Sequence, residues 1–320
     1  MESPGHWFLE STGHYFLESG GHWVLDFAIK SDSMRILFIK PLEETILSFV
    51  AKYAKRYDVT LYALAIEGNH TQYPALFPNE NRSSFMRDLN SSIARAVPRY
   101  TEHNGGRFWG RRYSNEFLPG NEDIEEYFFY TVLQPVKDGL VPKISEYPGY
   151  NCFSDAVWGR KRKFKVVKWK EYNARLKRDP TTKISDYTEI VELQYARLPG
   201  YEHLTQKEYA HLMMNKLEER RQAIVKDRLA RGLGFVGREK LLQTVPGSLP
   251  RNTKTSTIDD HRPRVLSICN FKRAECKAWY FDIYFKYKIA SSDYREGKPN
   301  VVFPHGTYPP HLPCNFKLAA

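Results

Sequence analysis

The alternation of apolar and polar positions predicts helices and strands in turn over the first half of the chain. Residues 41–57, 83–97 and 122–133 carry apolar side chains every three or four positions, with charged side chains between them, which is the pattern of amphipathic helices. The near-continuous apolar run at 59–66 and the segment 72–77 are typical of buried strands. This order predicts an α/β domain built around one sheet.

Prolines mark three positions within these elements. Pro98 and Pro135 predict the ends of two helices, because proline has no N–H and its ring crowds the preceding helical turn. Pro74 falls inside the predicted strand 72–77, where it removes a hydrogen bond from the ladder. That strand is therefore predicted to lie at a sheet edge or to be remodelled.

The N-terminal residues contain three copies of a Gly-His-aromatic-apolar-Leu-acid segment, which start at Gly5, Gly13 and Gly21. The period of eight is even, so the three histidines would share one face of a strand. A three-histidine metal site is one explanation, and local duplication of a strand-forming segment is the simpler one. The third copy is predicted to be the first strand of the fold, and the first two copies are predicted to be an extension.

The second half of the chain has a different pattern. Residues 205–229 predict a charged helix, and residues 273–291 predict an aromatic-rich helix whose role is packing. Between them, residues 232–263 are rich in Gly, Pro and Ser and predict a linker or an ordered loop. The predicted organisation is an N-terminal extension, an α/β domain and a basic, mainly helical C-terminal region: residues 1–20, 21–155 and 156–320.

Composition limits the classes of protein that fit. The 320 residues are 42% hydrophobic and 14% aromatic, values typical of a folded protein. No apolar run approaches the roughly 20 residues of a membrane helix, and no signal peptide is predicted. The four cysteines lack zinc-site spacing and are predicted to be reduced thiols. We therefore expect a cytoplasmic protein of prokaryotic type, associated with the nucleoid and making no membrane contact.

Positive charge favours a polyanionic partner. The formal net charge is +11, and residues 160–178 alone hold ten Lys and Arg against one acid. Phe164, Trp169 and Tyr172 are interleaved with those charges, which suits phosphate contacts beside base stacking. A solvated basic helix or hairpin is the alternative. The predicted nucleic-acid contacts in this segment are Arg160, Lys161, Arg162, Lys163 and Lys165.

Two short motifs sixty residues apart offer the parts of a catalytic site. His70 and Gln72 share one face of a strand, and Tyr130 and Gln134 lie one turn apart on a helix. If that helix crosses the strand, His70, Gln72 and Gln134 form a three-ligand metal site with Tyr130 beside it. Oxygen ligands with a single imidazole suit Mg²⁺ or Mn²⁺ better than zinc. A free tyrosine has a pKa near 10, so such an ion would assist Tyr130 as a nucleophile.

Several longer motifs resemble one known family. Phe85-Met86-Arg87-Asp88-Leu89-Asn90-Ser91, Arg107-Phe108-Trp109-Gly110-Arg111-Arg112-Tyr113, and Tyr130-x-x-x-Gln134 followed by Pro-Val-Lys-Asp-Gly-Leu-Val are similar to segments of the REP-associated tyrosine transposases. These are single-tyrosine members of the HUH endonuclease superfamily. The resemblance covers residues 21–155.

The resemblance implies a ferredoxin-like core, an antiparallel sheet with helices on one face, here followed by a mainly helical, basic extension. It also implies Mg²⁺- or Mn²⁺-dependent cleavage of single-stranded DNA near hairpins through a 5′-phosphotyrosine. Tyr130 falls on the nucleophile position, His70 on the first histidine of the metal pair and Gln134 on the third ligand. Gln72 stands where the family has its second histidine; a glutamine carbonyl can still coordinate a hard cation.

Further DNA contacts are predicted around the glycine- and arginine-rich loop 105–113. Arginine forks hold phosphate in bidentate fashion, and Trp109 offers a stacking plane for an unpaired base. The alternative is that Trp109 fills the edge of the core and the arginines are solvated. The predicted contacts outside the basic segment are Arg107, Trp109, Arg111, Arg112 and Lys137.

The sequence thus supports a transposase-like single-strand DNA endonuclease and strand transferase that uses a divalent ion. Its partner would be single-stranded or hairpin DNA, and a homodimer is possible. Two alternatives stay open: a catalytically decayed transposase that binds hairpins without cutting them, marked by Gln72, and a scaffold protein whose N-terminal repeats and aromatic helix serve association.

Overall fold

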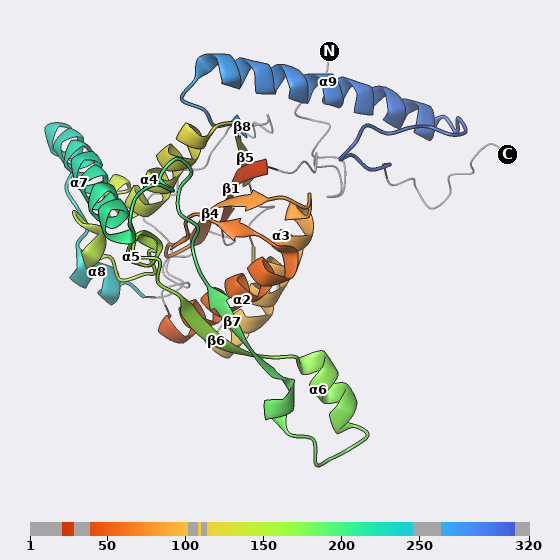
Figure 1. Ribbon diagram of the computed structural model, residues 1–320, viewed down its shortest axis with the longest axis horizontal. Helices are drawn as coiled ribbons and strands as arrows, with labels where there is room; N and C mark the ends of the chain where they lie inside the picture. The colour runs from red at the N-terminus through yellow and green to blue at the C-terminus, as the bar shows by residue number, and fades with distance from the viewer. Residues whose placement is uncertain (1–20, 29–38, 102–107, 110–113, 246–263, 311–320) are drawn as a thin grey trace.

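A computed structural model describes residues 21–28, 39–101, 108–109, 114–245 and 264–310. Its strands are β1 (Gly21–Ala28), β2 (Thr60–Leu61), β3 (Ala65–Ile66), β4 (His70–Phe77), β5 (Ser114–Leu118), β6 (Arg162–Val167), β7 (Thr188–Leu193) and β8 (Arg264–Val265). Its helices are α2 (Lys40–Tyr57), α3 (Arg82–Ala96), α4 (Asn121–Lys137), α5 (Phe153–Val157), α6 (Trp169–Leu176), α7 (Gln206–Ala230), α8 (Arg238–Gln243) and α9 (Asn270–Arg295), as Figure 1 shows. Short 3₁₀ turns span Val97–Arg99, Ile144–Glu146 and Ile184–Tyr187.

The third copy of the N-terminal repeat forms β1, as the sequence predicted, and β1 lies at the centre of the main sheet. The strand order is β2-β4-β1-β5-β8, with β3 also paired to β4. The pairs are antiparallel except β5 with β8. The expected mixed α/β fold with an antiparallel sheet is confirmed.

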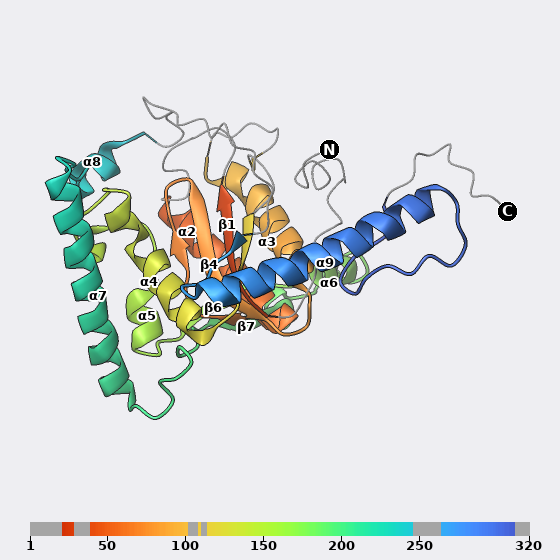
Figure 2. The same cartoon turned by 90° about the horizontal axis from the view of Figure 1, so that it is seen from above.

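Helices cover both faces of this sheet, whereas the family resemblance implied helices on one face only. On one face, Phe77 packs against Phe85 of α3 with 5.5 Å between ring centroids, and the Arg82 guanidinium lies 3.7 Å from the Trp23 ring centroid. Strand alternation turns His70, Gln72 and Pro74 to the other face, and the register places Glu116 of β5 on that same face. There α4 packs against β4, while α3 lies on the opposite side (Figure 2). The candidate site therefore lies on the α4 face.

Pro74 lies in β4, an inner strand of the sheet. Of the two alternatives predicted for this strand, the sheet edge is therefore wrong and the remodelled strand is correct. Its carbonyl accepts hydrogen bonds from the N–H groups of Tyr62 and Ala63, at 2.9 and 3.4 Å. In an antiparallel ladder the N–H and C=O of one residue point to the same side. The missing N–H thus faces the break between β2 and β3, and pairing of Pro74 with Val24 of β1 is undisturbed.

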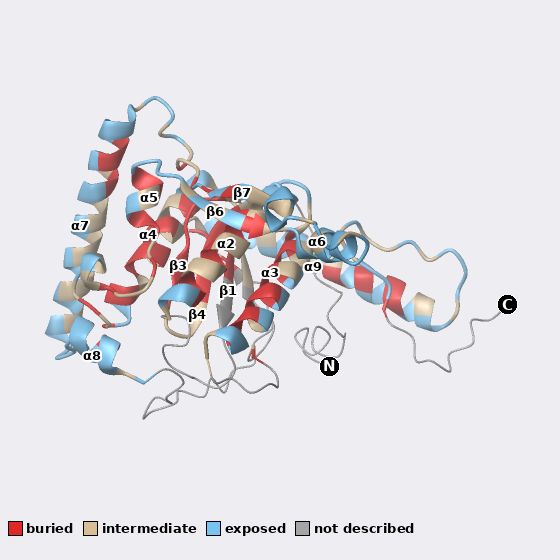
Figure 3. Cartoon of the chain, turned by 90° about the horizontal axis from the view of Figure 1, so that it is seen from below, coloured by how far each residue is buried: buried red, intermediate tan, exposed pale blue. Residues whose placement is uncertain are grey.

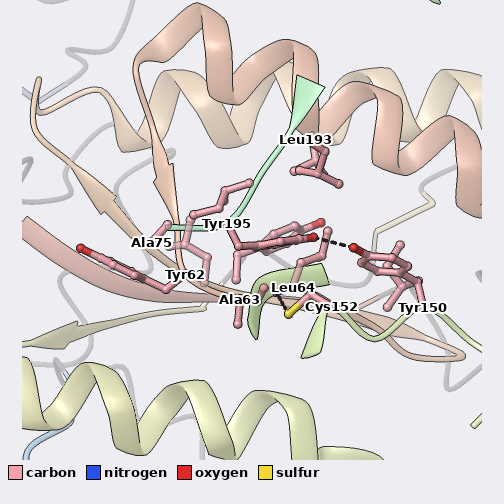
Figure 4. Packing of buried hydrophobic residues seen from close by; sticks show 14 of the residues in the cluster. Tyr62, Ala63, Leu64, Ala75, Tyr150, Cys152, Leu193 and Tyr195 are labelled. Atoms are coloured by element: carbon pink, nitrogen blue, oxygen red, sulfur yellow. Dashed lines mark hydrogen bonds between the residues drawn. The ribbon is translucent and has the colours of Figure 1, made fainter. Parts of the chain in front are cut away.

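The break between β2 and β3 is filled by the packing that Figure 4 shows. The Leu64 N–H donates to the Cys152 thiol at 3.1 Å instead of to a strand partner. Beside it, the Tyr150 and Tyr195 hydroxyls are 3.0 Å apart. Burial raises the pKa of the Cys152 thiol to about 12, so this cysteine is an inert core residue. The predicted single strand 59–66 is therefore two short strands.

Helix α4 continues past Pro135, where the sequence predicted its end. A Schellman motif closes it instead: the Leu140 N–H donates to the Pro135 carbonyl, and the Gly139 N–H donates to the Val136 carbonyl. Gly139 has φ +74°, a left-handed conformation that glycine adopts without steric cost. The extra turn of α4 sets the position of Lys137.

The C-terminal region packs on the same core through α4 and α7. Helix α7 begins with a capping box formed by Thr205 and Glu208. Lys216 of α7 forms an ion pair with Glu125 of α4 at 2.7 Å, and the Arg220 guanidinium lies 4.6 Å from the Phe129 ring centroid. Figure 3 shows the buried side of α4 turned into the molecule. Within the described residues, no helix is both long and apolar enough to cross a membrane.

We predict that Gly139→Ala lowers the free energy of unfolding by about 2–3 kcal/mol, because the left-handed φ is strained and the new Cβ would overlap the Arg228 guanidinium. That guanidinium donates to the carbonyls of Lys137 and Gly234. In an Arg228→Ala background the cost should fall to about 1–2 kcal/mol, the strain alone. Urea denaturation of the four proteins measures both values; an equal cost in the two backgrounds would contradict the overlap.

Candidate active site

A tight turn between β3 and β4 gathers polar side chains on the α4 face. The Glu67 N–H donates to the His70 carbonyl at 2.8 Å, and Ala65 pairs with Gln72 in the ladder. Residues that close such a turn project to the same face, as do residues two apart on a strand. Glu67, His70 and Gln72 therefore share one face of the hairpin.

The His70 ring lies between two polar partners of this turn. Its Nδ1 is 2.9 Å from the Asn69 Oδ1, and its Nε2 is 3.7 Å from a Glu67 carboxylate oxygen. With Nδ1–H donating to Asn69, the Nε2 lone pair points toward Glu67. A separation of 3.7 Å is long for a hydrogen bond, but two atoms that each lie about 2.1–2.3 Å from one cation can be separated by this distance.

Glu67 is not among the site residues predicted from the sequence. Glu67 is only 3% exposed. The Glu-Gly-Asn turn signal is typical of surface hairpins, and the burial comes from residues 147–151, which pack over the hairpin. The one signal in the sequence was the position of a carboxylate three residues before His70.

Residues 147–151 fasten α4 to this hairpin. The Asn151 side chain donates to the Val132 carbonyl of α4 at 2.8 Å, and the Ile66 N–H donates to the Tyr150 carbonyl at 3.0 Å. The Tyr147 hydroxyl donates to the Ile66 carbonyl at 3.1 Å. The helix that carries Tyr130 thus lies against the strand that carries His70 and Gln72, which is the arrangement that the predicted metal site requires.

The pKa of Tyr147 is shifted by its surroundings at this junction. Burial raises its pKa well above the usual value, and the nearby carboxylates of Glu67, Glu43 and Asp138 raise it further. The phenol therefore stays neutral and serves as a hydrogen-bond donor. Glu67 of the hairpin and Asp138 at the end of α4 thus both lie within electrostatic range of the Tyr147 hydroxyl.

Two amide oxygens at the junction lack hydrogen-bond partners among the residues that the structure describes: Gln72 Oε1 and Gln134 Oε1. Gln72 is only 6% exposed, so its oxygen is shielded from water as well. The Gln134 amide nitrogen donates to Asp138 at 3.1 Å, which orients its oxygen. A divalent cation would satisfy such oxygens.

The possible ligands at this junction are mostly oxygen atoms and carry little charge, which suits a hard cation. No cluster of three or more His, Cys, Asp or Glu suitable for a metal occurs in the described parts of the chain. A site here would rest on one imidazole, one carboxylate and two amide oxygens, from His70, Glu67, Gln72 and Gln134. This composition fits Mg²⁺ or Mn²⁺, the ions predicted from the sequence.

Tyr130 and Lys137 lie together on α4. Tyr130 is half-buried, and the Lys137 ammonium lies 3.9 Å from its ring centroid. The Tyr127 ring lies 5.6 Å from the Tyr130 ring, centroid to centroid. Burial raises the pKa of Tyr127 to about 12, and the negative charge of Glu116 makes the next largest contribution. Tyr127 is therefore poorly suited to act as a nucleophile, although it neighbours Tyr130.

Trp109 has partners within the fold. Its indole N–H donates to the Asn90 carbonyl at 3.0 Å, and its ring meets Phe108 at 4.6 Å between centroids. The half-buried indole thus packs at the edge of the core, the alternative that the sequence left open. The other predicted contacts of this loop lie outside the described residues: Arg107, Arg111 and Arg112.

The basic segment forms strand β6 and helix α6. Arg162 forms an ion pair with Glu44 of α2 at 2.7 Å, and Lys161 and Lys163 lie 3.3 and 3.6 Å from Glu192 of β7. Arg160 donates to the Ser154 hydroxyl at 3.2 Å, and Lys165 is exposed without an ion pair among the described residues. Most of these predicted DNA contacts thus have partners inside the protein.

Two solved structures resemble part of this chain. Among solved structures, the chain is similar to a REP-associated tyrosine transposase bound to a REP hairpin, with 17% identity, a TM-score of 0.38, and coverage of 44% of this chain and 80% of that chain. It is also similar to a protein described as a transposase from Deinococcus radiodurans R1, with 17% identity, a TM-score of 0.27, and coverage of 35% and 92%. Both TM-scores lie below 0.5, too low for either similarity to establish a shared fold or function.

No protein-family model matches the chain. No curated protein matches it either.

We predict that Gln72→Leu leaves the metal-free protein as stable as the parent or more stable by about 1 kcal/mol, because it removes a buried oxygen without a partner. The same change should abolish the stabilisation by Mn²⁺, which would be about 2.7 kcal/mol at one hundred times its dissociation constant. Thr71→Val is the matched control, since Thr71 is a buried neighbour on the other face whose hydroxyl also has no partner within the described structure. Urea denaturation with EDTA or Mn²⁺ measures both effects; loss of the Mn²⁺ effect in Thr71→Val as well would contradict the prediction.

Proposed function

We propose that this protein is a transposase-like, metal-dependent endonuclease and strand transferase that acts on single-stranded DNA through Tyr130. The observation that supports the proposal is the contact of α4, which carries Tyr130 and Gln134, with the β3–β4 hairpin, which carries His70 and Gln72; the amide oxygens of both glutamines lack partners among the described residues. The motif resemblance described from the sequence agrees with this chemistry.

His70, Gln72, Gln134 and Glu67 would hold Mg²⁺ or Mn²⁺. When bound, the ion would act as a Lewis acid that polarises a phosphate oxygen. Asn69 would keep His70 in the tautomer that presents Nε2, as hydrogen-bond partners of metal-binding histidines do. Asp138 would orient the Gln134 oxygen in the same way.

In the proposed reaction, the Tyr130 oxygen attacks phosphorus and forms a 5′-phosphotyrosine bond. The bond from phosphorus to the 3′-oxygen of the preceding nucleotide breaks, and that oxygen takes up the proton that the phenol gave up. A free 3′-hydroxyl later attacks the phosphotyrosine and restores both the DNA backbone and the phenol. The Lys137 ammonium beside the Tyr130 ring would attract phosphate and stabilise developing phenolate charge.

We predict that Tyr130→Phe abolishes covalent attachment to DNA and retains non-covalent binding. The assay mixes the protein with single-stranded hairpin DNA and Mn²⁺ and looks for a protein–DNA band on a denaturing gel. Tyr127→Phe is the matched control, since it removes a hydroxyl from the same helix face but should leave the band. A band that persists in Tyr130→Phe would sink the assignment, and hairpin binding without any band would favour the decayed, non-cutting alternative.

We further predict that Glu67→Gln weakens Mn²⁺ binding about 10- to 100-fold, because the change removes a negative charge from the site. Electron paramagnetic resonance of free Mn²⁺ measures the affinity without reference to activity. Glu80→Gln is the control, since Glu80 lies 3.6 Å from His305 in an exposed Glu–His pair. Unchanged Mn²⁺ affinity in Glu67→Gln would exclude Glu67 as a ligand.

A further inference from the structure

Residues 160–193 form an arm that extends from the core (Figure 1). Strands β6 and β7 make its root, and α6 lies at its far end. The root is fastened to α2 by the ion pair of Arg162 with Glu44 and by the buried side chains of Val166, Val191 and Leu193. These contacts hold the near part of the arm in a fixed position.

Charge is unevenly distributed along this arm. It holds eleven Lys and Arg against five Asp and Glu, a net charge of +6. At the root, Lys161 and Lys163 share the carboxylate of Glu192, and Glu189 lies 3.7 Å from Lys168. Five cations of the arm have no ion pair among the described residues: Lys165 in β6, and Lys170, Lys177, Arg178 and Lys183 beyond the root. Beyond the root, residues 169–187 hold five Lys and Arg against three acids, a net charge of +2, and four of those five cations have no ion pair in the described structure.

The tip also exposes aromatic and aliphatic side chains. Helix α6 has no buried residue, and Trp169 is 53% exposed. The Trp169 ring meets Tyr172 edge-on at 6.0 Å, and Tyr172 meets Tyr187 at 5.9 Å, so its neighbours orient it. Ile184 is 45% exposed on the following turn. An exposed tryptophan beside basic side chains that form no ion pair in the described structure is a combination that suits unpaired bases and their phosphates.

We propose that the tip of the arm, defined by Trp169, Lys170, Lys177 and Arg178, is a binding surface for single-stranded DNA. The proposal rests on the proposed function for the identity of the polymer, and on charge complementarity and an exposed stacking plane for the site. The arm is fastened to α2, whereas Tyr130 lies on α4. The tip is therefore a second DNA contact, apart from the site of cleavage, and it takes over the role that sequence reasoning gave to the root lysines.

The test measures binding of a fluorescent 30-nucleotide oligo(dT) by anisotropy between 50 and 300 mM salt, with EDTA present and Tyr130→Phe in every protein. The combined Lys170→Ala, Lys177→Ala and Arg178→Ala variant should lower the slope of log K against log salt by about 2, since each contact to a single strand contributes roughly 0.7. Trp169→Ala should weaken binding about 5- to 100-fold at constant salt. Folding should be retained, because α6 contributes no buried residue.

The matched control is Lys161→Ala with Lys163→Ala, whose lysines have ion pairs at the root and should leave the slope nearly unchanged. An equal slope change in tip and root variants, or no change in either, would overturn the proposal. So would binding to anionic phospholipid vesicles that competes fully with DNA and depends on the same side chains, since the surface would then be a membrane contact. Because the assay uses no metal and no Tyr130 hydroxyl, failure of the proposed catalysis cannot alter its outcome.

Discussion

The attachment of α4 to the β3–β4 hairpin is the constraint on which the candidate site depends. It runs through one short segment, in which Tyr147, Tyr150 and Asn151 hydrogen-bond backbone groups of both elements. Those backbone groups are buried, so breaking the attachment would leave polar atoms without partners at a cost of about 1–3 kcal/mol each. The helix with Tyr130 and the strand with His70 are therefore held together whether or not an ion is bound.

The same junction carries features that oppose stability. Buried amide oxygens of Gln72 and Gln134 lack partners among the described residues, and the carboxylate of Glu67 lies almost fully inside. Buried polar groups of this kind are expected at functional sites, where a ligand completes the hydrogen bonding that the fold leaves open. Stability and function are thus separable at Gln72, since an apolar residue would suit the fold and a ligand oxygen would suit the chemistry.

Charge in the C-terminal region divides into two kinds. Some basic residues hold elements together, such as Lys216 on Glu125 between α7 and α4, and Arg162 on Glu44 at the root of the arm. Others, such as Lys170 and Lys177, are exposed and form no ion pair in the described structure. Only the second kind is available to a polyanion, so net charge along the sequence overstates the area of the binding surface.

The sequence by itself determined the elements and the pairing of motifs. Helical and strand periodicity located α2, α3, α7 and β4 to within a few residues, and motif spacing placed His70 with Gln72 and Tyr130 with Gln134, because these patterns are local. Tertiary structure alone decided the burial of Glu67, the continuation of α4 through Pro135, and which lysines are neutralised. Each of these depends on contacts between residues far apart in the chain, such as Gly139 with Arg228 and Arg162 with Glu44, which no local pattern of side chains encodes.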